Sequence, residues 1–388
     1  MLKMIPWLFI ATVVVVAGCE GTQRGDGNEG DGGLDGGTDD TDSATGGNED
    51  ITCEPGEIWC YRGWVAKCNA EGKGWKKSKD CGQEGLVCAA GKCDDVSREC
   101  ADAINEHSYI GCDYWGTTLA NIELNWDTEN NVYNDGPFHY AIAVANNSND
   151  EAEVTVTDGA DINNNYTVPG GETITIEDLP WKMTIKNPGD CSTNTWATRK
   201  VANAAYHLTS TRPVTAYQFN PLHYQSGSKF SFTNDASLLL PSHVYRDEYM
   251  VMTRGTLKLQ TSLFSSMSRP GFVAIVGVEG GTTQLGVTSS AHTAASDIYS
   301  NATYPALAPG LTANIDIEPY EVLQILSDAE PGCTDTAACN SGTTSYQCCN
   351  APPEYDLTGT MIKVMSGPNP AVFAGTVMSF VPYNVWAA

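Results

Sequence analysis

From Tyr114 onward, apolar residues come in short runs of Val, Ile, Thr and Tyr, separated by Pro-Gly, Asn-Asp and Gly-Gly turn signals. Short runs with regular turns and no long 3.6-residue period predict an all-β region. The expected strands are Tyr140–Ala145, Glu153–Thr157, Thr173–Ile176, Val214–Phe219, Phe272–Val278, Val322–Leu326 and Met361–Met365. Before them, Ser97–His107 has a short helical pattern bracketed by Cys100 and Cys112.

Three landmarks occur twice, in the same order, within the β region. In the first landmark, Ala141–Ala145 followed by Val154 matches Ala274–Val278 followed by Val287. In the second, Val168-Pro-Gly-Gly before Ile174 matches Ala308-Pro-Gly-Leu before Ile315. In the third, Leu208-Thr-Ser with Pro213 matches Val364-Met-Ser with Pro370. Similar spacing predicts two packed β-sandwiches, at about residues 111–265 and 266–388. The alternative is one larger β structure in which the strands are similar by chance.

Residues 53–93 form a different kind of segment, a small cysteine-rich module. Its large apolar anchors are few, so a core of this size needs covalent support, which three disulfides would supply. Zinc is the competing interpretation, but the segment has no Cys-x2-Cys pair and no histidine. Six cysteines permit fifteen pairings, and the connectivity stays open. They are Cys53, Cys60, Cys68, Cys81, Cys88 and Cys93.

The N-terminus has the pattern of an export signal. Lys3 precedes thirteen residues of apolar character, Ile5–Ala17, and the small pair Ala17-Gly18 stands before Cys19. This run is too short to span a bilayer, which takes about 20 apolar residues. The small pair followed by cysteine resembles the lipobox of bacterial lipoproteins, which implies a signal peptide at 1–18 and lipidation of Cys19. The alternative is an ordinary cleaved signal in which Cys19 is incidental.

Residues 19–52 are expected to be a disordered tether after the lipidated cysteine. Gly, Asp, Thr, Asn and Ser dominate this segment, and it has almost no apolar surface to bury. Its run of aspartates, Asp31–Asp42, lacks the alternating ligands and closing carboxylate of a calcium loop. Residues 94–110 would then link the module to the β region that begins at 111.

The chain has 14 cysteines, which in an exported protein implies disulfides rather than free thiols. Cys100 and Cys112 are disulfide candidates. An insertion in the second repeat holds a group of four further cysteines, and disulfides among them would fix a long surface loop. Cys191 has no obvious partner. The group comprises Cys333, Cys339, Cys348 and Cys349.

Charge and motifs exclude several classes of function. The formal net charge of −26 excludes duplex nucleic acid as a partner, because binding it requires a basic surface. There is no nucleophile elbow, His-Glu-x-x-His motif, phosphate loop or dinucleotide fingerprint. His207, His223 and His243 would have to converge with Asp235 to make a metal or acid–base site. Isolated histidines at strand ends are more often structural, so we predict no catalytic residue, metal or cofactor.

The most specific segment of the β region is Thr233-Asn-Asp-Ala-Ser-Leu-Leu-Leu-Pro241. With Tyr206-His-Leu-Thr-Ser, Pro213–Pro221 and Gly111-Cys112-Asp-Tyr-Trp115, it resembles the N-terminal domain of IgG Fc-binding proteins from about Tyr109 to the end. The family motif falls on Asn234, Asp235, Ser237 and Pro241, where Asn234 and Asp235 are expected to close a turn. The family usually continues past the position of Ala388, so the chain is expected to end inside its domain.

Together these features predict a non-catalytic, lipid-anchored lipoprotein of a bacterial cell envelope. Glu20 after the lipidated cysteine, with the long tether, favours the outer membrane or cell surface. The β-sandwiches would bind a protein or a glycan through the Cys333–Cys349 loop and the turns near Asn220–Lys229, because loops on rigid scaffolds concentrate function. The alternatives are a hydrolase of envelope or host polymers and a structural protein of a surface matrix.

Overall fold

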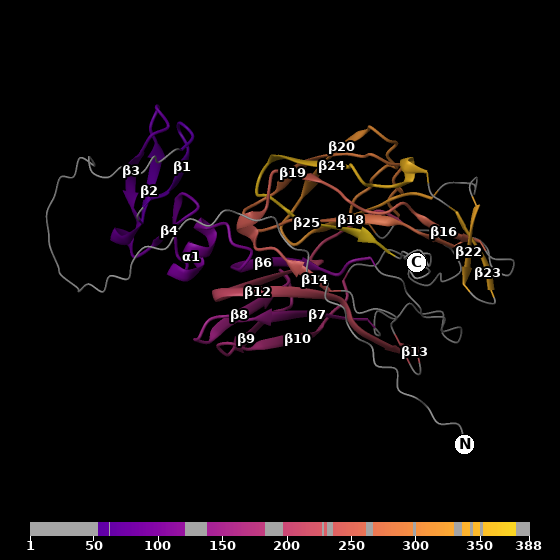
Figure 1. Ribbon diagram of the computed structural model, residues 1–388, viewed down its shortest axis with the longest axis horizontal. Coiled ribbons are helices and arrows are strands. Elements are labelled where there is room, and N and C mark those ends of the chain that lie inside the picture. Colours follow the sequence, from indigo (N-terminus) through magenta and orange to yellow (C-terminus); the bar gives the residue numbers. More distant parts are fainter. Residues whose placement is uncertain are drawn as a thin grey trace, which may run out of the picture. The chain divides into compact units, whose positions relative to one another are not determined.

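The computed structural model describes residues 53–61, 63–120, 138–182, 197–226, 229–230, 236–260, 267–297, 300–329, 336–341, 344–349 and 352–377 (Figure 1). These residues belong to one compact unit, Ile51–Ala388. The predicted signal, Cys19, the tether, Cys191, Cys333, Asn234 and Asp235 lie outside the described residues. No helix among the described residues is long and apolar enough to cross a membrane.

The cysteine-rich module is a small β structure held by disulfides, as its composition predicts. A three-stranded antiparallel sheet is followed by a 3-10 helix, Cys81–Glu84, and a two-stranded hairpin. Its strands are β1 (Ile58–Tyr61), β2 (Trp64–Cys68), β3 (Trp75–Asp80), β4 (Val87–Ala89) and β5 (Lys92–Asp94). Three disulfides use all six cysteines of the module: Cys53–Cys68, Cys60–Cys88 and Cys81–Cys93.

The predicted helix is present as α1 (Arg98–Asn105). Ser97 caps it, accepting a hydrogen bond from the Cys100 amide at 3.2 Å, which satisfies one of the free donors of the first turn. A fourth disulfide joins Cys100 to Cys112, so α1 is covalently tied to the first strand of the β region. Cys100, Ala101 and Ala103 form its buried face.

The first sandwich has two sheets that share the long strand β12. Residues 207–210 of β12 pair with β8, whereas residues 215–219 pair with β7, so the strand changes sheets at Thr211–Pro213. The sheet orders are β6-β12-β8-β9 and β10-β7-β12-β14. The strands are β6 (Gly111–Thr117), β7 (Phe138–Ala145), β8 (Ala152–Thr157), β9 (Asn163–Val168), β10 (Thr173–Leu179), β12 (Ala205–Ser226) and β14 (Ala236–Leu239).

The second sandwich has the same plan, in the orders β15-β24-β19-β20 and β11-β21-β18-β25 (Figure 1). Here two strands replace the two halves of β12: β24 pairs with β19, and β25 pairs with β18. The strands are β11 (Arg199–Val201), β15 (Glu248–Met250), β18 (Gly271–Val276), β19 (Thr283–Thr288), β20 (Thr312–Ile317), β21 (Val322–Leu326), β24 (Met361–Ser366) and β25 (Ala371–Thr376).

Strand pairing confirms the first and third repeat landmarks and corrects the second. Ile174 lies in β10, which pairs with β7, but Ile315 lies in β20, which pairs with β19. By pairing, β10 corresponds to β21, and β9 corresponds to β20. The match was wrong because a Pro-Gly turn precedes both β10 and β20, and a turn signal does not identify the connection that it serves.

Two short strands pair across the predicted boundary at 265/266. β11 joins the edge of β21, and β15 joins the edge of β24, although both precede residue 266. The domain boundaries themselves stay predictions.

Each sandwich has its own core, and a third cluster joins the two. Strands β18 and β21 are buried along their whole length, because alternate side chains point into different clusters. Val273 and Ile275 pack inside the second sandwich, whereas Phe272 and Ala274 pack towards Trp115 of the first. Continuous apolar runs such as Val322–Leu326 are what a strand covered on both faces requires.

The insertion of the second repeat forms strands instead of the predicted surface loop. A hairpin of β22 (Thr336–Ser341) and β23 (Thr344–Cys349) extends a four-stranded sheet with β16 (Leu257–Gln260) and β17 (Met267–Arg269). In register, Cys339 faces Tyr346 and Cys348 faces Ala337. The predicted pairing within this cysteine group stays a prediction. Similarly, Gln225 and Ser226 pair with the two-residue strand β13 (Lys229–Phe230), within the predicted contact region 220–229.

Candidate functional site: the loop end of the first sandwich

Three turns meet at one end of the first sandwich, which we call the loop end: Asn146–Glu151, Pro169–Glu172 and the β12 corner at 210–213. Asn146 organises the first two turns. Its side-chain amide donates to the carbonyls of Asp150 at 2.8 Å and Val168 at 3.0 Å, and its oxygen accepts from Ser148. This buried amide is fully used in holding the turns, so its role is structural.

The second turn depends on glycine. A Cβ at Gly170 would lie 2.2 Å from the Asn149 carbonyl oxygen, so no other residue allows the two turns to approach this closely. Gly171, by contrast, has a φ of 74° and open space around the position of a Cβ. The turn therefore presents its backbone, without a side chain, at residue 171.

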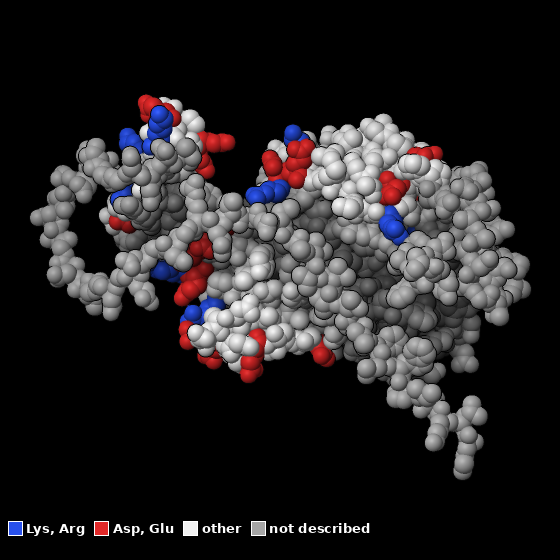
Figure 2. Space-filling view, viewed as in Figure 1, with Lys and Arg blue, Asp and Glu red and all other residues white. Residues whose placement is uncertain are grey.

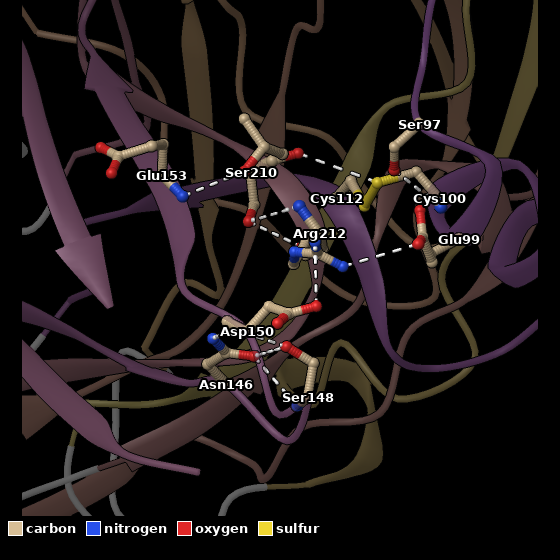
Figure 3. Close-up of polar contacts among 11 residues, drawn as sticks. Ser97, Glu99, Cys100, Cys112, Asn146, Ser148, Asp150, Glu153, Ser210 and Arg212 are labelled. Atoms are coloured by element: carbon tan, nitrogen blue, oxygen red, sulfur yellow. Dashed lines mark hydrogen bonds and ion pairs between the residues drawn. A yellow bond between two sulfur atoms is a disulfide. The ribbon is translucent and has the colours of Figure 1, made fainter. Parts of the chain in front are cut away.

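Arg212 stands at the corner of β12 and connects the loop end to α1 (Figure 3). Its guanidinium lies 3.1 Å from the Asp150 carboxylate and 3.5 Å from that of Glu99, which is in the first turn of α1. The Ser210 hydroxyl donates to the Arg212 carbonyl at 2.7 Å, which fixes the corner. Since Asp150 and Glu99 are largely exposed, these ion pairs contribute little stability and are open to competition by a ligand.

The disulfide positions α1 against this corner. Cys100 Sγ lies 3.8 Å from the Ser210 carbonyl oxygen, and Cys112 is in β6 beside β12 (Figure 3). Glu99 is consequently placed on one side of Arg212, with Asp150 on the other. The covalent bond thus builds a site from two segments that lie far apart in the sequence.

A pocket of about 820 Å³ lies between α1 and the loop end. Four carboxylates and one guanidinium line it, so its character is polar and, on balance, acidic. It is an open surface depression and not an enclosed cavity. The lining residues are Ser97, Glu99, Asn149, Asp150, Glu151, Glu153, Pro169, Gly170, Thr211 and Arg212.

A second polar cluster lies between the two sandwiches, around His207. Its ring stacks on Trp115 at 4.2 Å, and its Nε2 lies 2.9 Å from the Asp113 carboxylate. Burial opposes ionisation of Asp113, but hydrogen bonds and the charge of His207 outweigh it and lower the pKa of this carboxyl. From the second sandwich, Tyr320 packs against Trp115 at 4.8 Å and hydrogen-bonds Glu279 and Thr157. Burial raises the pKa of Tyr320 to about 12.

Of the convergent site considered from the sequence, the structure describes the side chains of His207 and His243. His243 interacts with the Ser108 carbonyl at 2.7 Å, and burial lowers its pKa. His223 pairs in register with His139 on β7, and Asp235 lies outside the described residues. In the described part of the chain, no three His, Cys, Asp or Glu side chains are placed to hold a metal ion.

The family-motif residues that the structure describes are near β6 and β12. Ser237 lies in β14, paired with Gln218, and Pro241 forms an isolated bridge with Tyr114. A Cβ at Gly111 would stand 2.6 Å from that of Pro241, so this part of the motif closes the sandwich edge. Neither residue lines the pocket. The sequence singled out neither Arg212 nor Tyr320, because their partners, such as Glu99 and His207, lie more than a hundred residues away in the sequence.

Comparison with known proteins gives one family. The model described as "IgGFc binding protein" matches residues 235–388, which is less than half of the chain and contains the second sandwich apart from β11. The resemblance expected for 109–234 lies outside the matched segment. No curated protein and no solved structure matches the chain. Similarity to the IgGFc-binding family is therefore established for the C-terminal part.

Proposed function

We propose that this chain is a non-catalytic binding protein of a bacterial cell envelope, held to a membrane by lipid on Cys19. The family match over residues 235–388 is the observation that carries the binding role, since the description of that family names the binding of a protein. The tandem sandwiches support it, because they offer turns on a rigid scaffold, where binding residues concentrate.

The binding site that we propose is the pocket at Arg212, which lies outside the matched residues 235–388 and is chosen for its geometry. Carboxylates on both sides of the guanidinium favour a partner that brings its own cation, which can replace Arg212 as the counter-ion of Asp150 or Glu99. A protein segment with exposed lysine or arginine meets this requirement. A glycan, which offers hydroxyl groups without charge, would gain less from this lining and is the less favoured ligand.

Binding is tested with an immunoglobulin Fc fragment as the first probe, followed by Lys/Arg-rich peptides and common glycans. We expect Arg212→Glu to change the affinity at least about fivefold, or about 1 kcal/mol. Arg246→Glu is the matched control, because Arg246 is exposed and does not line the pocket. If deletion of Gly332–Asn350 abolishes binding and Arg212→Glu does not, the site belongs to the β22–β23 hairpin. Turnover of casein, peptidoglycan or glycans would favour the hydrolase alternative.

Anchoring is tested separately. Because acyl attachment needs the thiol, Cys19→Ser should move the folded protein from the membrane fraction to the soluble fraction. A several-chain lipid anchor resists washing, whereas a peripheral protein detaches in high salt. Retention of the serine variant on membranes after a high-salt wash would exclude the lipid anchor.

A further inference from the structure

The two sandwiches share more than strand order, because a tyrosine occupies the same position in each. Tyr114 Oη donates to the Val214 carbonyl and accepts from the Gly111 amide. Tyr249 Oη donates to the Pro370 carbonyl and accepts from the amide of Arg246, again three residues earlier. Residues around these tyrosines can therefore be matched one by one.

This match places Met250 and Met361 where the first sandwich has Trp115 and His207. Trp115 pairs with His207 across β6 and β12, one position after Tyr114. Met250 pairs with Met361 across β15 and β24, one position after Tyr249. Both pairs lie on the outer face of their sheet, since Tyr206, Leu208, Ile362 and Val364 point into the cores.

The environments of the two equivalent faces differ. In the first sandwich, Trp115 is 2% exposed and His207 7%. Tyr320 and other residues of the second sandwich, including Phe272, pack on this face. In the second sandwich, Met250 is 73% exposed and Met365, on the same outer face of β24, is 53% exposed. We call Met250, Met361 and Met365 the methionine face. Figure 2 shows a largely uncharged surface where Figure 1 places β20 and β24.

The segment that covers Trp115 also has an equivalent, and it is at the loop end. The Tyr320 amide donates to the Gly277 carbonyl at 2.9 Å, and the Gly277 amide donates to the Glu321 carbonyl at 2.9 Å. In the first sandwich, Gly171 donates to the Asn146 carbonyl at 3.0 Å, and Asn146 donates to that of Glu172 at 2.9 Å. Tyr320 and Gly171 both have a positive φ, 64° and 74°. The two turns are the same structure.

We propose that the methionine face binds the loop end of the first sandwich of a second copy of this chain. Inside one chain, the second sandwich covers the outer face of the first with the turn at Tyr320 and with side chains of β18 and β21, such as Phe272 and Val322. A second copy of the chain can continue this arrangement, because every copy carries the turn at Gly171, where the surface is open. That turn would lie on the methionine face of the first copy. Flexible methionines can adapt to a turn that lacks the tyrosine ring.

Charge supports this pairing. Inside the chain, Lys200 of β11 forms an ion pair of 2.5 Å with Glu321, next to β21, so this turn of the second sandwich already carries a paired carboxylate. Glu172, the equivalent of Glu321, is exposed at the loop end, and Lys363 is exposed on the outer face of β24 between Met361 and Met365. The interface joins two different surfaces, so its repetition gives a ring or an open filament and not a symmetric dimer, and larger oligomers are expected as the concentration rises. This inference goes beyond the proposed function, although both use the loop end and a ligand at Arg212 would compete with a second copy there. Ligand binding at Arg212 can still fail while self-association holds.

Sedimentation velocity of the full chain carrying Cys19→Ser, which removes lipid-driven aggregation, tests the proposal. We expect the mean sedimentation coefficient to rise with protein concentration. Met250→Glu on the methionine face and Glu172→Lys on the loop end should each shift the rise to at least about tenfold higher concentration. Ile58→Glu, which changes a 54% exposed side chain in the cysteine-rich module, is the matched control and should have no effect.

Mixing the two variants distinguishes head-to-tail contact from a symmetric dimer. Each variant keeps one good surface, so the mixture should form a one-to-one dimer and stop there. A chain that stays monomeric at all concentrations overturns the proposal. Self-association that Met250→Glu leaves unchanged also overturns it. The same holds if self-association depends on Met250 and not on Glu172, because the contact would then use other surfaces. Near-UV circular dichroism of each variant shows that it remains folded.

Discussion

The phenol ring of Tyr320 lies on Gly159, so that a Cβ at residue 159 would stand 2.6 Å from Tyr320 Cγ. Gly159 follows β8 of the first sandwich, whereas Tyr320 precedes β21 of the second. Backbone contacts reinforce this junction, because the amides of Ala204 and Ala205 both donate to the Tyr320 carbonyl, at 3.0 and 3.3 Å. One residue of the second sandwich thus occupies a position that glycine keeps open in the first.

Gly159→Ala should destabilise the protein by about 2–4 kcal/mol. The added methyl group meets the Tyr320 ring, and alanine is strained at a φ of 75°. Gly171→Ala is the control, because it causes the same backbone strain but its methyl group meets no other atom. Its free energy of unfolding should fall by only about 1–2 kcal/mol. Urea unfolding followed by tryptophan fluorescence measures both. Equal losses would mean that the Tyr320 contact does not matter.

Tyr320→Ala should destabilise the junction by about 3 kcal/mol, since it removes a ring packed against Trp115 and His207. Tyr320→Phe keeps the ring and loses only the hydroxyl contacts to Glu279 and Thr157, so a loss of about 1 kcal/mol is expected. Tyr217→Ala serves as the control, because Tyr217 is 41% exposed. The loss of stability should be largest for Tyr320→Ala, smaller for Tyr320→Phe and smallest for Tyr217→Ala, and the denaturation midpoint of each variant measures it. A Phe variant as unstable as the Ala variant would contradict it.

Asp158 should contribute stability that is lost in acid. Burial opposes its ionisation, but hydrogen bonds from Lys182 at 2.6 Å and from the amides of Ile162 and Ala160 lower the pKa of its carboxyl below 3.8. The depressed folded-state pKa gives stability that is complete above pH 3.8 and is lost as the pH falls towards the folded-state value.

Asp158→Asn should therefore lower stability at neutral pH and flatten its decline below pH 3.8. Asp161→Asn, in the same turn but exposed, is the control and should leave that decline as steep as in the parent protein. Thermal unfolding at a series of pH values measures both. A decline below pH 3.8 that is unchanged in Asp158→Asn would show that this carboxyl does not carry the effect.

The sequence predicted the strands well and the contacts between them poorly. Alternation in Ala152–Thr157 and continuous apolar runs in Val322–Leu326 are local signals, and both strands lie where these patterns place them. Arg212 and Tyr320 are different, because their roles depend on partners more than a hundred residues away, such as Glu99 and His207. The insertion with Cys333–Cys349 was read as a loop because its strands are rich in Thr, Ser and Asn, which turns also favour.

The Cys100–Cys112 disulfide should be required for α1 to form at the pocket. The helix has only eight residues, and a helix of that length is not stable alone in water. Replacing both cysteines by serine should speed amide hydrogen exchange across Arg98–Asn105, while amides of β7 and β18 stay protected. A stability loss of about 3 kcal/mol is expected from the loop that the bond closes.

The matched control is the pair Cys81–Cys93, which has the same sequence separation of 12 residues. Its removal should loosen the cysteine-rich module and leave exchange in α1 nearly unchanged. Because Glu99 is in α1, loss of the Cys100–Cys112 disulfide should also lower the affinity of any ligand that binds at Arg212. Loss of the Cys81–Cys93 disulfide should leave that affinity unchanged. If both double variants protect α1 equally well, then packing of Ala101 and Ala103 holds the helix, and the disulfide does not build the site.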